Sequence, residues 1–124
     1  MNPERWFALM GAISAFLAVA AGAFGAHLLR GRLSAEMLTV FETGVRYHMY
    51  HALALMGASW LVSRWPTPQA VWAGWFFVAG TVIFSGSLYI LSLTGVRWWG
   101  AVTPIGGVSF LLGWGCLIWT LARS

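Results

Sequence analysis

The stretch FALMGAISAFLAVAAGAFGAHLL, from Phe7 to Leu29, decides the fold class of this chain. It holds 23 residues, and His27 carries its only ionisable side chain. Since about 20 apolar residues in a helix cross the hydrocarbon core of a bilayer, the stretch predicts a membrane span. Residues 21–23 (Ala-Gly-Ala) look like a signal-peptide cleavage site, but the apolar stretch is longer than that of a usual signal peptide. We therefore expect the segment to be retained as the first span.

The composition extends this prediction to the whole chain of 124 residues. Hydrophobic residues make up 60% and charged residues 8%, whereas about 25% of the residues in soluble domains are charged. A soluble domain of this size has too much surface for its volume to bury so much apolar area. The single cysteine, Cys116, excludes a disulfide scaffold. We expect one membrane domain over residues 1–124.

Three further apolar segments follow the first, and helix-breaking residues separate the last three. The expected spans cover residues 6–29, 47–65, 70–93 and 98–121. Pro66 and Pro68 bracket a tight turn before the third span, and residues 94–97 (Thr-Gly-Val-Arg) form a short loop before the fourth. Because short connections join antiparallel neighbours, the sequence predicts an all-α, four-transmembrane-helix antiparallel bundle with both termini on one side.

Residues 30–46 form the only long connection. Ser34 is the predicted N-cap of a helix, with Glu36 in its first turn. On a helical wheel, polar side chains share one arc and apolar side chains fill the opposite arc. This pattern predicts a short amphipathic helix over residues 35–46, between the first two spans, at the membrane interface or against the bundle. The following apolar run, residues 47–62, crosses completely only if that helix continues into it.

The net charge of +4 does not indicate a nucleic-acid-binding protein. The seven basic residues are arginines spread singly, and most flank apolar segments, where positive residues anchor helix ends among lipid headgroups. No basic run follows a phosphate backbone. Lysine and aspartate are absent, and no Ser-His-Asp set, Walker loop or dinucleotide fingerprint is present. Nothing in the sequence therefore indicates an enzyme.

Ionisable residues gather at the start of the second span and at the end of the first. Glu42 and Arg46 have the spacing and order of a helical ion pair. His27 ends the first span on the same side of the membrane, which allows it to approach His51. Two interpretations stay open: a polar site for an ion, a small molecule or a lipid, and the solvated face of an amphipathic helix, where exposed ion pairs are common and weak.

The histidines also allow two interpretations. Three imidazoles can bind copper or zinc, and two can ligate haem iron; the candidates are His27, His48 and His51. No carboxylate or thiolate joins them in a metal-binding motif, so hydrogen bonds between helices are the simpler role. We expect no cofactor, with haem or copper as the alternative.

Small residues predict close contacts between helices, because they let backbones approach each other in lipid. Ala18, Gly22 and Ala26 recur at four-residue spacing in the first span. The candidate packing residues are Gly22, Gly25, Gly86, Pro104, Gly106 and Gly107. We expect Pro104 in the first turns of the fourth span, followed by a close-packing glycine pair; a deeper proline would interrupt that helix. So many small faces on few helices suggest contacts with other chains as well.

Three ordered motifs resemble the signatures of one family. They are residues 22–27 (GAFGAH), residues 41–55 (FETGVRYHMYHALAL), and residues 84–89 (FSGSLY) followed by 103–107 (TPIGG). Together they resemble the YgdD-like family of small membrane proteins, defined by domain of unknown function 423, which includes the transmembrane protein 256 type. The resemblance covers nearly the whole chain. It implies an integral membrane protein with several helices, located in bacteria in the inner membrane.

The resemblance implies no catalytic residue, because the family's activity is unassigned. The matching motif positions are His27, Glu42, Tyr47, His51, Ser85, Tyr89, Pro104 and Gly106. His48 stands where the family pattern often has glutamine, and this departure leaves His27 and His51 as the better metal-ligating pair.

These observations predict a structural or accessory protein that acts in the bilayer through helix packing, as a homo-oligomer or with a partner membrane subunit. A first alternative is transport or lipid binding at a polar site; its candidate residues are His27, Glu42, Arg46, Tyr47, His51 and Tyr89. A second alternative is haem or copper binding by His27 and His51.

Overall fold

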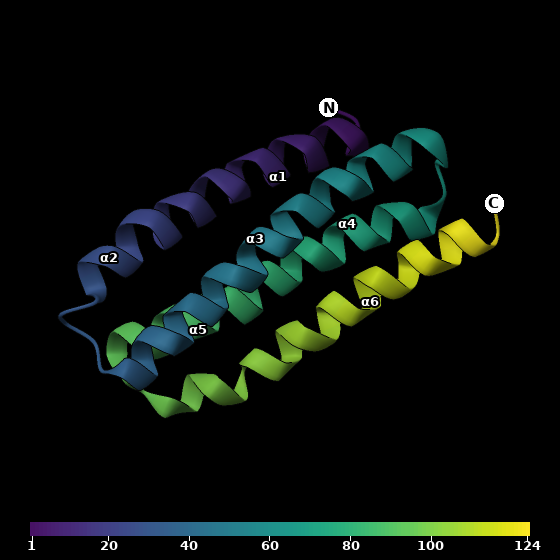
Figure 1. The fold of residues 1–124 in the computed structure, drawn as a ribbon. Coiled ribbons are helices and arrows are strands. Elements are labelled where there is room, and N and C mark those ends of the chain that lie inside the picture. The colour runs from purple at the N-terminus through teal and green to yellow at the C-terminus, as the bar shows by residue number, and fades with distance from the viewer.

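The computed structural model describes residues 1–124 and consists of helices without strands. The helices are α1 (Pro3–Val19), α2 (Ala26–Leu29), α3 (Ala35–Arg64), α4 (Pro68–Gly80), α5 (Gly86–Thr94) and α6 (Thr103–Ala122). Wider π-helical turns, Ala20–Gly25 and Thr81–Ser85, join α1 to α2 and α4 to α5 without a break, and a 3₁₀ turn, Arg97–Ala101, precedes α6. The chain therefore forms four long rods, which Figure 1 shows side by side.

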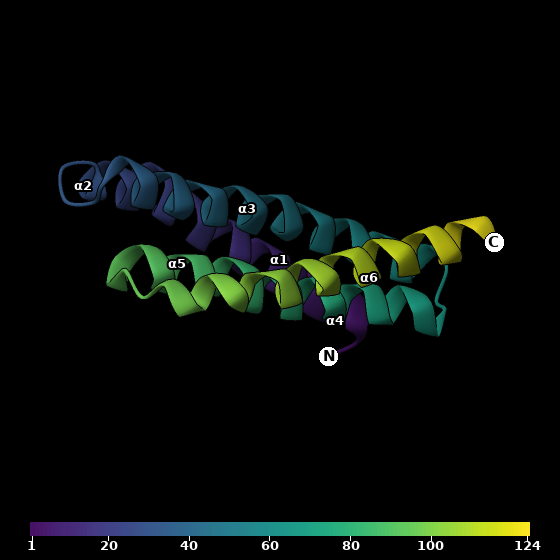
Figure 2. The same ribbon diagram turned by 90° about the horizontal axis from the view of Figure 1, so that it is seen from below.

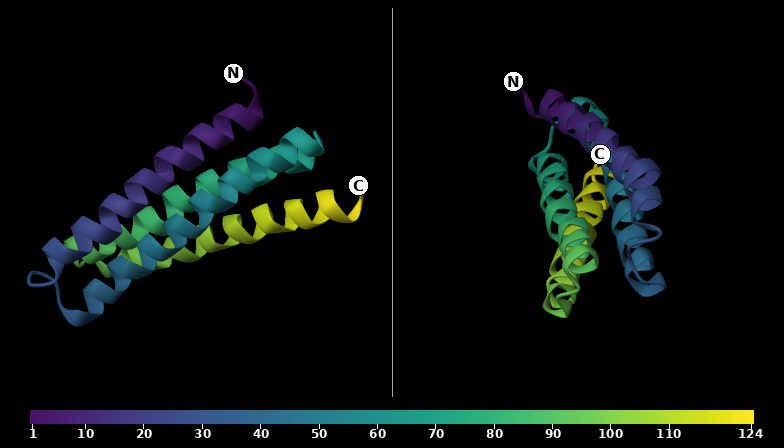
Figure 3. Two further views of the ribbon diagram at one scale, coloured as in Figure 1. Left: turned by 45° about the horizontal axis from the view of Figure 1, so that its top comes forward. Right: turned by 90° about the vertical axis from the view of Figure 1, so that its left-hand side faces the viewer.

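Successive rods run in opposite directions, and both termini lie at the same end of the bundle (Figures 1 and 3). α1 packs along α3, and α4 packs along α6. α3 also packs on α4 and α5, so α3 and the α4–α5 rod form the middle of the molecule. Figure 2 shows α3 over α4, α5 and α6, with α1 running obliquely behind them from the level of α3 at its α2 end to the level of α4 at the N-terminus. α1 and α6 thus lie on opposite flanks of the central pair.

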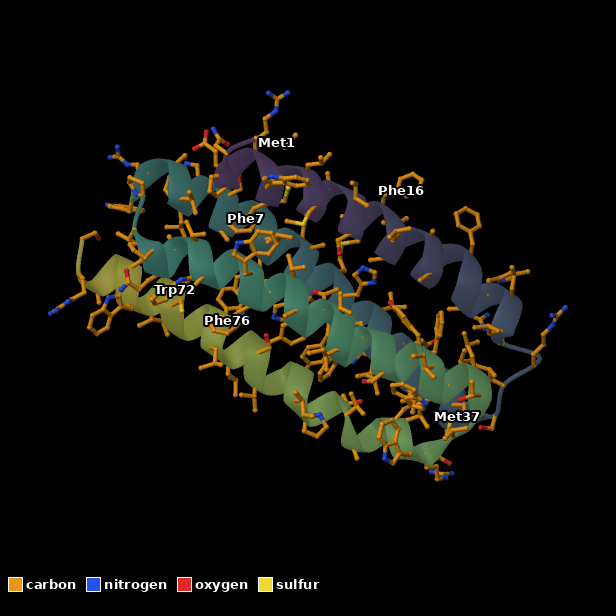
Figure 4. The ribbon with its side chains drawn as sticks, turned by 180° about the vertical axis from the view of Figure 1, so that it is seen from behind. Met1, Phe7, Phe16, Met37, Trp72 and Phe76 are labelled. Carbon is orange, nitrogen blue, oxygen red and sulfur yellow. The ribbon has the colours of Figure 1, made fainter.

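Three of the rods are long and apolar enough to cross a membrane: Pro3–Leu29, Pro68–Thr94 and Arg97–Ala122. Their outward faces carry large apolar side chains, such as Phe16, which is 75% exposed and projects from the bundle in Figure 4. Phe7 lies fully buried between α1 and α4. A surface this rich in large apolar side chains is suited to lipid, because extended exposed apolar surface is rare on soluble monomers.

The structure differs from the sequence-based prediction in one element. Residues 35–46 do not form a separate short helix but are the first part of α3, which runs unbroken to Arg64. Ser34 caps it as expected, since its side chain accepts a hydrogen bond from the amide of Met37 at 3.2 Å. No proline interrupts residues 35–64. Both halves of α3 also pack on the first rod, the first half on the π-helical turn Ala20–Gly25 and the second half on α1. The amphipathic pattern therefore does not mark a break in the helix.

The turns follow their local sequence signals. Thr67 caps α4, its hydroxyl accepting a hydrogen bond from the amide of Ala70 at 3.1 Å, and Pro68 occupies the first turn. Gly95 closes α5 with a φ of +73°, a left-handed conformation that glycine adopts without steric cost. Pro104 lies in the first turn of α6, where proline does not interrupt the helix.

One ion pair links the loop before α6 to the start of α3. Nη1 of Arg97 donates a hydrogen bond to Oε1 of Glu36 at 3.0 Å. This contact lowers the pKa of Glu36 below its ordinary value of 4.5. Because both side chains are largely exposed, the pair adds little to stability.

The lowered pKa predicts a small acid-sensitive contribution to stability. A carboxylate with a depressed pKa stabilises the folded state above its ordinary pKa, and this contribution is lost as the pH falls through the depressed value. We expect the melting temperature of the wild type to fall slightly more than that of Glu36→Gln when the pH is lowered below 4.5. Thermal unfolding of both proteins in one detergent measures the difference, and parallel pH profiles would contradict the prediction.

Candidate functional site

His51 is buried near the middle of α3 and joins it to α6. Its Nδ1 lies 2.9 Å from the carbonyl oxygen of Tyr47, and its Nε2 accepts a hydrogen bond from the indole N–H of Trp114 at 3.1 Å. The ring also stacks on Phe110, with 3.5 Å between the ring centroids. Since an indole nitrogen only donates, this network assigns the proton of a neutral imidazole to Nδ1. Both nitrogens of His51 are thus engaged within the chain.

His48 lies one turn before His51 and joins α3 to α5. Its Nδ1 is 2.9 Å from the hydroxyl of Tyr89, and its side chain is only 8% exposed. The hydroxyl of Ser85 donates to the carbonyl of Gly44 at 2.7 Å in the same contact between helices. His48 Nε2 has no hydrogen-bond partner in the chain, yet it is not sealed from the surface. One buried imidazole therefore keeps a free nitrogen.

His48 lines a groove of about 420 Å³ between α1 and the α4–α5 rod, with α3 at its base. Figure 4 looks onto this side of the molecule. The walls are mainly apolar, and the polar residues that line the groove are Ser14, His48, Thr81, Ser85 and Tyr89. Thr81 belongs to the π-helical turn after α4, and such turns recur at functional sites.

A second groove, of about 510 Å³, runs between α3 and α6 on the opposite flank. It is almost wholly apolar, and Leu53 and Gly57 of α3 face Trp114 and Ile118 of α6 across it. A Cβ atom added at Gly57 would meet nothing within 4 Å. This flank of α3 is therefore open to a further helix or to lipid.

His27 and His51 are not brought together. Along the rod Pro3–Leu29 and α3, Gly25 faces Phe41 and Gly11 faces Ala52, so His27 lies near the level of residue 39. Twelve residues of helix, about 18 Å, separate that level from His51. No group of three or more His, Cys, Asp or Glu side chains is placed to hold a metal ion.

The remaining polar candidates lie along the outer side of α3. Glu42 is half-buried and Arg46 is exposed; they form no ion pair, because the Glu36–Arg97 contact is the only one in the structure. The ring of Tyr47 packs against Phe84, with 4.7 Å between the centroids. The polar side chains thus form two groups: the contact between α3 and α5, which contains His48 and Tyr89, and the exposed face of α3, which contains Arg46.

The candidate packing glycines fall into two groups, those in contact with another helix of the chain and those without such a contact. Gly22 faces Val45, Gly25 faces Phe41, and Gly106 lies directly against the backbone of Phe84. A Cβ atom added at Gly107 would lie 4.0 Å from the nearest side chain, and one added at Gly86 would meet nothing within 4 Å. The first three positions serve contacts within one chain, and the other two leave room at the surface.

Sequence reasoning gave His48 little weight, although a signal for its role was present. Gly44 and His48 are four residues apart on α3, and Ser85 and Tyr89 have the same spacing in the third span. Residues at this spacing share one helix face. Two matching stripes, each with a polar residue at its end, therefore indicated a polar contact between these helices.

The chain resembles known sequences over most of its length. Residues 21–107 match the family described as Protein of unknown function (DUF423). UPF0382 membrane protein YwdK of Bacillus subtilis is 51% identical over 109 residues, which are 87% of this chain and 89% of the relative. UPF0382 inner membrane protein YgdD of Escherichia coli K12 is 43% identical over 115 residues, which are 93% and 88%. No solved structure matches the chain.

Proposed function

Because the chain belongs to the DUF423 family of membrane proteins, we propose that it is a four-span protein of the inner membrane that assembles with a second copy of itself. In this proposal the contact is formed by the exposed face of α3, which carries Glu42, Arg46, Tyr50, Leu53 and Trp60. The protein acts as a structural or accessory component through that assembly. The relatives and the three apolar rods place the protein in a membrane. The fourth span and the self-association are the proposed steps.

The contact between α1 and α3 supports a membrane position for α3. Near one end the hydroxyl of Ser59 donates to the carbonyl of Glu4 at 2.5 Å, and near the other end Phe41 packs against Gly25. The 30 residues of α3 extend about 45 Å, which exceeds the roughly 30 Å of a hydrocarbon core. A bilayer that surrounds α1 over its length therefore also surrounds α3.

The position of Arg46 supports a partner for this helix. Arg46 lies three to four residues from the middle of α3, which is about 5 Å along the axis. It is exposed and has no ion-pair partner in the chain. An unpaired charge near the middle of a membrane-spanning helix is costly in hydrocarbon. Charged residues in spans therefore face protein or water and pair with other groups. This unpaired Arg46, beside an unpaired Glu42, is the observation that carries the proposal.

The same face of α3 is complementary to itself. Glu42 and Arg46 are one turn apart, so two parallel copies related by a two-fold axis along the membrane normal would bring each Glu42 near the partner copy's arginine. Tyr50, Leu53 and Trp60 continue the face and are 52%, 60% and 59% exposed. Gly57 lies between Leu53 and Trp60 with free space above it, which allows two helix backbones to approach.

Charge-reversal variants produced together test this contact. E42R makes both charges of the face basic, and R46E makes both acidic. We expect each variant alone to lose self-association, and the two together, with different affinity tags, to copurify as a mixed assembly. Since neither variant retains an acid–base pair on its own helix, recovery reports pairing between copies.

The wild type with two tags is the positive control, and E42R with two tags is the matched negative control. Native mass spectrometry from a mild detergent gives the copy number. A wild-type chain that stays monomeric at protein-to-detergent ratios close to the protein-to-lipid ratio of a membrane would refute the proposal. Equal copurification of like-charged and opposite-charged pairs would refute the assigned face.

A further inference from the structure

We propose that the groove between α1 and the α4–α5 rod binds an isoprenoid quinone, with an oxygen of the quinone ring hydrogen-bonded to Nε2 of His48. The groove lies on the opposite side of α3 from the exposed face that forms the proposed contact between copies, so this inference is independent of the function proposed above. It concerns binding and assigns no redox reaction to the protein.

The groove opens toward lipid at mid-membrane depth. Ser14 lies near the middle of the rod Pro3–Leu29, and Thr81 lies at the middle of the rod Pro68–Thr94. Apolar side chains such as Ile13, Leu17 and Val82 form the walls. A ligand therefore enters sideways from the bilayer core and presents apolar surface to most of the groove. The volume of about 420 Å³ is in the range of small-molecule sites.

The base of the groove has unused hydrogen-bonding capacity. Nε2 of His48 is free, although the side chain is more than nine-tenths buried. Hydroxyls on helices commonly bond to the carbonyl four residues earlier, as those of Thr39 and Thr94 do here. The hydroxyls of Ser14 and Thr81 form no such bond although both line the groove. Unpaired polar atoms are costly where no water is available, so these groups favour a ligand with oxygen atoms.

The chemistry of the lining selects an uncharged ligand. No arginine, lysine, aspartate or glutamate lines the groove, so a phospholipid headgroup or a fatty-acid carboxylate would have no counter-charge there. Charged headgroups also stay at the membrane surface, far from mid-span residues. An isoprenoid quinone has an apolar ring with two neutral oxygens and an apolar tail, and it dissolves in the hydrocarbon core. Its polar and apolar parts match the base and the walls of the groove.

The His48–Tyr89 pair suits both forms of such a ring. If the hydroxyl of Tyr89 donates to Nδ1, the protonated Nε2 donates to a quinone carbonyl; if Nδ1 donates to the hydroxyl, Nε2 accepts from a quinol hydroxyl. The 2.9 Å contact accommodates either direction, because its donor depends on the tautomer. A change of tautomer therefore adapts one site to both ligands.

The three histidines make binding directly measurable. In protein labelled with ¹⁵N-histidine, the ring nitrogens give separate signals for His27, His48 and His51. We expect a short-chain menaquinone, added to the protein in phosphatidylcholine nanodiscs, to shift the His48 signals saturably and to leave those of His27 and His51 unchanged. Squalene, which has an isoprenoid chain without oxygen, and oleate, which has a charged head, should not produce this shift.

A matched pair of glycine variants locates the site. Gly86 lines the groove and has nothing within 4 Å of an added Cβ, so Gly86→Leu fills the groove without a clash at that atom. Gly115 on α6 is equally open and lies outside the groove. We expect Gly86→Leu to weaken menaquinone binding at least tenfold and Gly115→Leu to leave it unchanged, with an unshifted His51 signal showing an intact core in both. An unchanged His48 signal at saturating menaquinone, equal shifts with squalene or oleate, or unaltered binding by Gly86→Leu would each overturn the proposal.

Discussion

Gly106→Leu should abolish stable packing of α6 on the α4–α5 rod, whereas Gly107→Leu should leave the protein folded. A Cβ atom at residue 106 would overlap the backbone nitrogen and the Cα of Phe84. Backbone inside a helix cannot move aside as a flexible side chain can, so the two helices would have to separate. Overpacking in cores costs about 1–3 kcal/mol, and occasionally more. We expect a loss above 3 kcal/mol here, because a whole leucine side chain must fit where one methyl group does not.

The neighbouring glycine is the matched control for this prediction. A Cβ atom at residue 107 would lie 4.0 Å from the ring of Phe84 and would meet nothing closer. Both substitutions add the same side chain to the same turn of α6, so a difference between them reports the helix contact and not helix propensity or membrane insertion. Denaturant titration in mixed micelles, followed by tryptophan fluorescence, measures the unfolding free energies. Equal losses for the two variants would contradict the close approach at Gly106.

His51→Ala should be the most damaging polar-to-alanine substitution in the chain. The ring is 5% exposed, stacks on Phe110 and contacts Trp114 and Phe77. Its removal leaves a cavity between α3 and α6, and loss of a buried aromatic side chain costs about 3–5 kcal/mol. The indole N–H of Trp114 also loses its acceptor. We expect a large drop in the unfolding free energy, measured as for the glycine variants.

Two further variants separate packing from hydrogen bonding at His51. Trp114→Phe removes the indole donor and keeps an aromatic ring, and hydrogen bonds between membrane helices contribute about 0.6 kcal/mol on average. His51→Phe keeps the stacking on Phe110 and removes both hydrogen bonds. We expect both to be much milder than His51→Ala. If Trp114→Phe destabilised the protein as strongly as His51→Ala, the hydrogen bond and not the ring packing would be the main contribution.

The family and the membrane location could be recognised from the sequence. The motif resemblance is confirmed by the family match and by relatives that are 43–51% identical. The predicted helical fold is also confirmed. It could be predicted because it rests on local signals. Apolar runs of sufficient length, the cap at Thr67 and the turn at Gly95 act within a few residues and require no knowledge of distant contacts.

The course of α3 was harder to predict, because the pattern of residues 35–64 changes where the backbone does not. Charged residues on the first half resemble an interfacial helix, and the apolar second half resembles a short span. Whether two such halves form one helix depends on the surfaces they pack against. The contacts of Gly44 with Leu88 and of Phe41 with Gly25 hold the first half in the bundle, and neither contact is local in sequence.

The amino-acid sequence by itself determined which segments are helical and that they belong in a membrane, since hydrophobicity, capping and turn chemistry act over short stretches of chain. Only the tertiary structure decided which polar side chains meet. The register of α1 against α3 separates His27 from His51, and the rotation of α3 against α5 pairs His48 with Tyr89. Register and rotation arise from the fit of glycines against bulky side chains on distant segments, and this fit exists only when the helices are packed together.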